Sequence, residues 1–160
     1  MADSASPQHS SNPQLTAILF CREVILEANT GMISPFRLVQ RAEIPIPNVV
    51  TDLTIWQGVS VHLFVGVDCH GTELDHEHAL RMKGFAPSGE MIGDKSLGPA
   101  KISKDEPIAY VNIELNLPGS IAGKYRFEVW LDEKLAGTTY FTVRHKRIDI
   151  PGHPPEYIEG

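Results

Sequence analysis

The stretch AYVNIELNL, residues 109–117, decides the fold class, because apolar and polar residues alternate along it without a break. Successive side chains of a β-strand point to opposite faces, so this pattern predicts a strand with one apolar and one polar face. Two further stretches alternate in the same way, VSVHLFVGV at 59–67 and YRFEVWL at 125–131. Together the three strands predict a core that contains Val61, Val65, Val111, Ile113, Leu115, Phe127 and Val129.

Weaker patterns predict the remaining strands. Residues 135–143 return after Asp132-Glu133-Lys134, which indicates a hairpin with residues 125–131. A loop of three residues would keep the core-facing residues of both strands on the same side of the sheet. Residues 35–46 alternate in part, and Pro45 and Pro47 place their end on a sheet edge or at a bend because proline cannot donate to a ladder. Residues 78–85 predict another edge strand, followed by a long loop over 86–107.

The segment from residue 15 to residue 28 fits two structures. Asn12-Pro13 would begin a helix well and Asn29-Gly31 would end it. The β-branched and aromatic residues within it favour a strand, and apolar residues surround the alternative helix almost completely. We expect a strand, with a helix as the alternative.

Composition agrees with an all-β protein of one domain. The 160 residues are 42% hydrophobic, and 13 Gly and 12 Pro favour many turns over long helices. Seven to eight strands without βαβ alternation predict an antiparallel sandwich of two sheets. We expect a flexible N-terminal tail over residues 1–14, the sandwich over 15–146, and an extended C-terminal tail over 147–160.

Charge and sequence ends limit the compartment and the partners. The net charge of −6 opposes binding to phosphate backbones, so we expect no nucleic-acid partner. The apolar stretches are too short to span a bilayer, and the polar N-terminus has no basic region of a secretory signal. With Cys21 and Cys69 as its only cysteines, the chain is expected to be cytoplasmic, with reduced thiols.

Two segments carry a resemblance to a known family. FCREVILEANTGMISPFRLVQRAEIP, residues 20–45, and GKYRFEVWLDEKLAGTTYFTV, residues 123–143, resemble a family of small bacterial and phage-borne β-sandwich proteins known only as a domain of unknown function. The resemblance implies an immunoglobulin-like sandwich in an intracellular setting. It implies no catalytic residues.

A histidine-rich turn over residues 68–78 is the segment that best suits a metal. Imidazole, thiolate and carboxylate are all zinc ligands, but their spacing here matches no standard signature, and a solvated polar turn explains them better, because loops gather polar residues without function far more often than with it. The possible ligands are Cys69, His70, Asp75, His76 and His78. We expect no metal, no cofactor and no catalytic residues, and a metal- or small-ligand-binding protein, perhaps hydrolytic, is the alternative function.

The outward positions of residues 125–143 suit a protein contact. Arg126 and Trp130 lie opposite the core parity of their strand, Tyr140 lies on the outward parity of the returning strand, and Tyr157 lies in the tail. Exposed aromatic residues beside arginine are typical of protein interfaces, and a cover formed by the C-terminal tail or by the loop over 86–107 is the alternative of equal weight. The sequence therefore predicts a non-enzymatic module that binds a protein partner or assembles into a homodimer.

Overall fold

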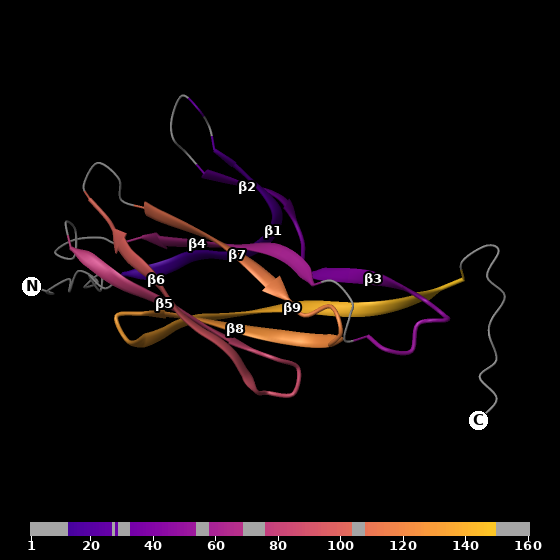
Figure 1. Ribbon diagram of the computed structural model, residues 1–160. Helices are drawn as coiled ribbons and strands as arrows, with labels where there is room; N and C mark the ends of the chain where they lie inside the picture. Colours follow the sequence, from indigo (N-terminus) through magenta and orange to yellow (C-terminus); the bar gives the residue numbers. More distant parts are fainter. Residues whose placement is uncertain are drawn as a thin grey trace, which may run out of the picture.

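The computed structural model describes residues 13–26, 28, 33–53, 58–68, 76–103 and 108–149, and every regular element among them is a strand (Figure 1). The strands are β1 (Gln14–Leu26), β2 (Ile33–Leu38), β3 (Arg41–Pro47), β4 (Val59–Asp68), β5 (Glu77–Phe85), β6 (Met91–Lys101), β7 (Ile108–Leu117), β8 (Gly123–Leu131) and β9 (Lys134–Ile148). β1 begins at Gln14 and β9 ends at Ile148, and the division into a sandwich over 15–146 between two tails stays a prediction.

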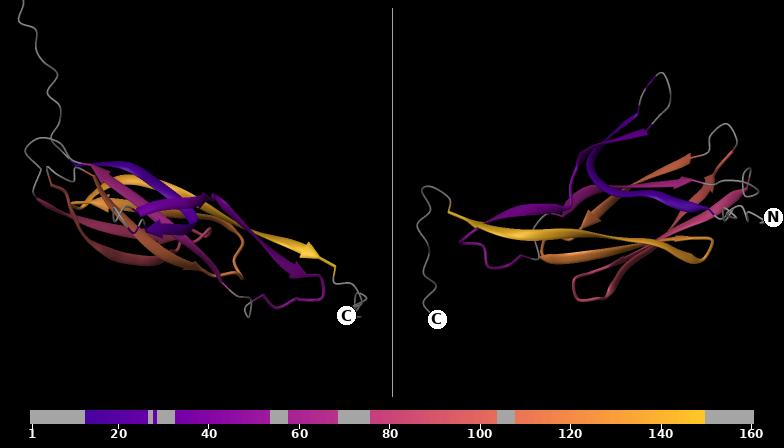
Figure 2. Two further views of the ribbon diagram at one scale, coloured as in Figure 1. Left: turned by 90° about the horizontal axis from the view of Figure 1, so that it is seen from above. Right: turned by 180° about the vertical axis from the view of Figure 1, so that it is seen from behind.

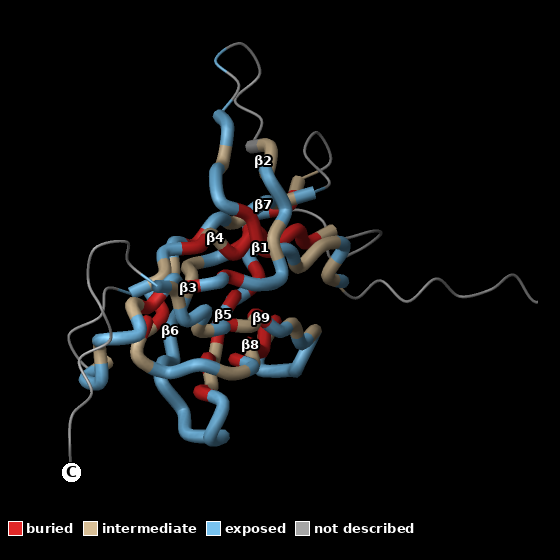
Figure 3. The backbone as a smooth tube through the Cα atoms, turned by 90° about the vertical axis from the view of Figure 1, so that its right-hand side faces the viewer, coloured by how far each residue is buried: buried red, intermediate tan, exposed pale blue. Residues whose placement is uncertain are grey.

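The strands form two sheets with the orders β2-β1-β4-β7 and β3-β9-β8-β5-β6. The sheets lie face to face, and buried residues line the space between them (Figures 2 and 3). Phe20 of β1 reaches across this space, with ring centroids 5.4 Å from Phe127 and 5.1 Å from Phe141. The predicted all-β sandwich is confirmed, and one pair, β3 with β9, is parallel rather than antiparallel.

The predicted core is confirmed in most positions. Five of the seven expected residues are at most 6% exposed: Val61, Val65, Ile113, Phe127 and Val129. Val111 and Leu115 have the expected inward parity but are only half-buried. The reason is that β7 is the last strand of its sheet, so no strand among the described residues pairs with its far side.

β1 settles the choice between strand and helix in favour of the strand. Its first part pairs with β4 as far as Cys21 and His62, and its second part pairs with β2. Beyond Cys21 the β1–β2 hairpin leaves the sandwich as a two-stranded arm (Figure 1). The single strand expected over 35–46 is instead two strands in different sheets, and Pro45 and Pro47 lie on an edge as expected, in β3.

The expectation for residues 78–107 is wrong in two respects. β5 is not an edge strand, because it lies between β8 and β6. The expected loop over 86–107 contains β6, which is the true edge. Residues 91–96 are exposed on both faces, so this strand has no apolar face that alternation could reveal.

The β8–β9 hairpin is confirmed, but its loop has two residues rather than three. Leu131 pairs with Lys134, and Asp132 and Glu133 have φ of 47° and 66°. Two positive φ values characterise a type I′ turn. The register shift after Val129 accommodates one extra residue in β9 and restores the inward parity that a three-residue loop was expected to provide.

Tyr125 at the start of β8 fixes the turn that precedes this strand. Its ring is fully buried, and its hydroxyl donates to the carbonyl oxygen of Ile121 at 2.9 Å. A tyrosine that bonds the backbone a few residues upstream, at the entry to this strand, is the tyrosine corner of immunoglobulin-like sandwiches. The two-sheet topology together with this corner identifies the fold as immunoglobulin-like.

Candidate functional site: the outer face of the five-stranded sheet

The side chains of β5, β6, β8 and β9 that point away from the core form an ordered cluster, which we call the outer face. Its central members are Arg81, Lys83, Phe85, Asp94, Arg126, Glu128, Trp130 and Tyr140. The sequence predicted three of them, Arg126, Trp130 and Tyr140, and the structure places all three on this face. Of the described strands, these four present the densest set of aromatic and charged contacts.

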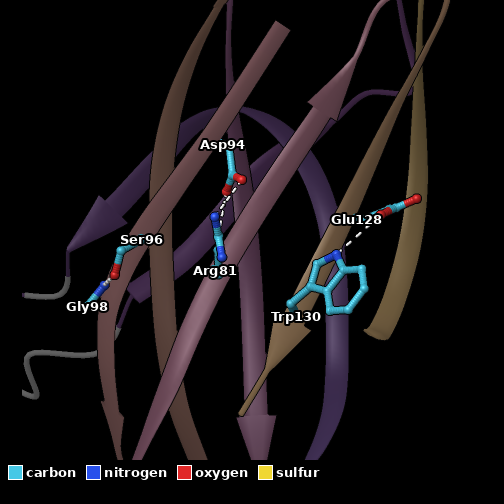
Figure 4. Close-up of polar contacts among 6 residues, drawn as sticks. All are labelled: Arg81, Asp94, Ser96, Gly98, Glu128 and Trp130. Carbon is cyan, nitrogen blue, oxygen red and sulfur yellow. Dashed lines mark hydrogen bonds and ion pairs between the residues drawn. The ribbon is translucent and has the colours of Figure 1, made fainter. Parts of the chain in front are cut away.

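Trp130 occupies the centre of the outer face and is held from two sides. Its indole nitrogen donates to Glu128 Oε2 at 3.2 Å, as Figure 4 shows. The Lys83 ammonium lies over the ring, 4.1 Å from its centroid, where the electron-rich face attracts a cation. The half-buried indole is therefore fixed in orientation.

Glu128 is a carboxylate that lies on an outward position yet is only 8% exposed. Besides the Trp130 indole, it accepts a hydrogen bond from Arg126 Nη1 at 2.5 Å. The Arg126 guanidinium in turn lies 4.1 Å from the centroid of the Phe85 ring. A carboxylate removed from water needs such partners, and this one has a cation and an N–H donor.

A bidentate ion pair joins β5 to β6 beside the tryptophan. Arg81 donates to both carboxylate oxygens of Asp94, at 2.5 and 2.6 Å (Figure 4). The hydrogen bond from Arg81 lowers the pKa of Asp94, and the same bond raises the pKa of Arg81. A further cation–π contact lies on the β8–β9 side, with Lys124 4.0 Å from the centroid of the Tyr140 ring.

A groove of about 470 Å³ runs between the ion pair and the tryptophan. Its lining residues include Arg81, Lys83, Asp94, Ser96, Trp130 and Glu133. The groove is open rather than enclosed, unlike the concave pockets that bury a small ligand.

The outer face is basic although the protein is acidic. The register places eight basic residues on the outward side of the five strands, namely Arg41, Arg81, Lys83, Lys101, Lys124, Arg126, Arg144 and Lys146. Four acidic residues share that side, namely Glu43, Glu77, Asp94 and Glu128. The chain as a whole has a net charge of −6, so positive charge is concentrated on this sheet.

Sequence reasoning missed Arg81, Lys83 and Asp94. Their contacts join strands that are far apart along the chain, and they follow from the pairing of Arg81 with Trp130 and of Lys83 with both Glu128 and Asp94. The outward parity of residues 79–85 was the available signal. This parity alone could not show that Arg81 and Lys83 lie beside Trp130 and Asp94, because that depends on the order of the strands in the sheet.

The other predicted site residues lie elsewhere. Cys69, His70, Asp75 and Tyr157 are outside the described residues. His76 is exposed just before β5, whereas His78 is buried. Within the described ranges no three His, Cys, Asp or Glu side chains come together as a metal site, and whether the turn binds metal stays a prediction.

His78 has a structural place. It is 3% exposed on the inward side of β5, and its Nδ1 lies 2.7 Å from Asp132 Oδ2. Asp132 also accepts a hydrogen bond from the backbone N–H of Ala79 and donates its own N–H to the Ala79 carbonyl. These contacts fix the β8–β9 turn against β5.

Comparisons with known proteins show likeness in fold. No family model matches the chain, and no curated protein matches it either. The chain is similar to an alkylpurine DNA glycosylase of Pseudomonas fluorescens, solved bound to DNA containing an abasic site analogue, with 7% identity and a TM-score of 0.54. The likeness covers 84% of this chain and 31% of the glycosylase, so the chain spans about a third of that protein.

Two further solved structures are more distant. An immunoglobulin-like protein from Pseudomonas aeruginosa has 15% identity and a TM-score of 0.42, over 83% of this chain and 97% of its own. A β-glucosidase from Kluyveromyces marxianus has 16% identity and a TM-score of 0.37, over 62% of this chain and 15% of its own. The bacterial and phage family that the sequence resembles stays a prediction. Among the described residues no helix could cross a membrane.

Proposed function

We propose that the protein is a non-enzymatic binding module whose outer face docks an acidic surface of another protein. The observation that carries the proposal is Trp130, half-exposed at the centre of a basic sheet and fixed there by Glu128 and Lys83. Tryptophan and arginine dominate the binding energy of protein interfaces, and a side chain that is already ordered loses less entropy on binding.

The sign of the charge points to the partner's chemistry. The ammonium groups of Lys83 and Lys124 lie over the Trp130 and Tyr140 rings on the outer face, where the carboxylates of a partner can approach them. Complementary charge speeds the encounter and excludes wrong partners. A glutamate- or aspartate-rich surface therefore suits this face.

A protein suits the outer face better than a nucleic acid does. Asp94 and Glu128 interrupt the basic residues, so this face has no continuous track of positive charge for the regularly spaced phosphates of a duplex, whereas a protein surface can place its few carboxylates beside the lysines alone. The chain's net charge of −6 adds a repulsion over longer range. We therefore expect no binding to DNA, and the experiment below includes a DNA duplex to test this.

The test measures fluorescence anisotropy of a labelled random copolymer of glutamate and tyrosine, titrated with the full chain. A lysine–tyrosine copolymer and a labelled DNA duplex serve as competing probes. We expect the acidic copolymer alone to bind, with an affinity that falls as salt rises. Preference for the duplex, or equal binding of both copolymers, would contradict the proposal.

Matched variants localise the binding. Lys83→Glu and Arg22→Glu change the net charge equally, but Arg22 is exposed on β1 in the other sheet. We expect about a tenfold loss of affinity for Lys83→Glu, which corresponds to about 1.4 kcal/mol, and a much smaller loss for Arg22→Glu. Equal losses would show that only net charge matters.

A further inference from the structure

Three of the four sheet edges carry features that block pairing with another strand. β2 contains Pro35 and a left-handed residue, Arg37, with φ of 54°. β3 contains Pro45 and Pro47, which have no N–H to donate. β6 has two register shifts against β5 and a left-handed glycine, Gly98. Prolines, bulges and kinks of this kind protect natural edge strands.

β7, the fourth edge, has none of these features. It pairs with β4 over all ten residues without a register shift. Its sequence, IAYVNIELNL, contains no proline, glycine, lysine or arginine, and its one charged residue is Glu114. Within the described part of the chain it pairs on one side only, so its outer backbone groups form a regular template for a further strand.

The core is also open along β7. Val111 and Leu115 are half-buried, while their partners in β4, Val65 and Val61, are 0% and 1% exposed. A strand added outside β7 would cover the remaining apolar surface of both residues. It would need apolar side chains at alternate positions on the core side.

We propose that this added strand is β7 of a second copy, in antiparallel pairing about a two-fold axis. β7 itself has an apolar residue at every core-side position, which is the pattern the edge needs: Ala109, Val111, Ile113, Leu115 and Leu117. Two-fold pairing joins the four-stranded sheets of both copies into one sheet and leaves neither β7 edge free.

Charge is compatible with this pairing. Glu114 is the only charged residue of β7, and it accepts a hydrogen bond from Ser60 of β4 at 2.8 Å. In any two-fold register that is not centred on Glu114, the two carboxylates face uncharged residues of the other copy. The outer face lies on the other sheet, so the dimer leaves it available, and this inference does not depend on the proposed function.

The test is sedimentation equilibrium of the full chain across a range of micromolar concentrations. We expect a mass that approaches twice the 17.7 kDa of one chain. Val111→Lys and Asn112→Lys each place a lysine from both copies on the pairing edge, and either should weaken dimerisation by about tenfold or more, because edge lysines oppose strand pairing. Asn112 is exposed, so its variant retains the fold even if Val111→Lys does not.

Two controls make the result specific. Phe36→Lys places the same charge on the protected β2 edge, and a chain without residues 150–160 lacks the C-terminal tail. Both should dimerise like the native chain. A native chain that stays monomeric, a dimer that neither β7 variant weakens, or a dimer lost with the tail would overturn the proposal.

Discussion

The hydroxyl of Tyr125 donates to the carbonyl oxygen of Ile121, four residues earlier, at 2.9 Å. This bond fixes the turn between β7 and β8 and so links the last strand of one sheet to a central strand of the other. Burial raises the pKa of Tyr125, because the phenolate would lose its hydration inside the sandwich.

Tyr125→Phe should lower the free energy of unfolding by about 1–2 kcal/mol at neutral pH, since a buried acceptor loses its donor. The native chain should also lose stability as the pH rises above about 10, because the unfolded tyrosine ionises there and the raised pKa of the folded one delays its ionisation to a higher pH. Urea unfolding between pH 7 and pH 11 measures both effects. Tyr140→Phe, at an exposed position, is the control, and an equal cost at both sites would argue against the corner.

Glu133→Gly should stabilise the protein. Glu133 has a φ of 66°, and a residue with a Cβ pays about 1 kcal/mol or more for this left-handed backbone. Asp-Gly is a preferred sequence for the type I′ turn. Thermal unfolding should show a rise of about 2–4 °C for each kcal/mol gained. Glu133→Ala removes the same carboxylate without relieving the backbone, so a rise in that variant as well would point to charge instead.

Phe127→Ala should destabilise the protein by about 3–5 kcal/mol, the cost typical of a deleted aromatic core residue. Its ring is 2% exposed and packs against Phe20 of the opposite sheet, so its loss opens a cavity between the sheets. Chemical unfolding compares this variant with Phe36→Ala, whose ring is 45% exposed. Similar losses for both variants would mean that Phe127 is not a core residue.

The fold could be predicted from the sequence where one face of a strand is buried and the other is exposed to solvent. Alternation located β4, β7 and β8 for this reason, and it also gave the correct parity of Val111 and Leu115. It could not give their depth, which depends on β7 being an edge. β6 was missed because residues 91–96 are exposed on both faces, so apolar and polar residues do not alternate along it. Its pairing with β5 follows from tertiary structure alone.

The candidate site could be predicted only within one hairpin. Parity placed Arg126, Trp130 and Tyr140 outward, since β8 and β9 are adjacent in the sequence. Lys83 reaches the Trp130 ring across more than forty residues of chain, and such a contact depends on strand order. The basic character of the sheet was hidden for the same reason, because its members are spread over five strands of an acidic chain.

The most direct test of the outer face follows the fluorescence of Trp130 itself. The chain has two tryptophans, so Trp56→Phe leaves Trp130 as the only reporter. Titration with the unlabelled glutamate–tyrosine copolymer should produce a saturable change in its emission, and Lys83→Glu should move the midpoint to about tenfold higher concentration. Copolymer binding without any change in Trp130 emission would show that the partner surface lies elsewhere, and would contradict the account.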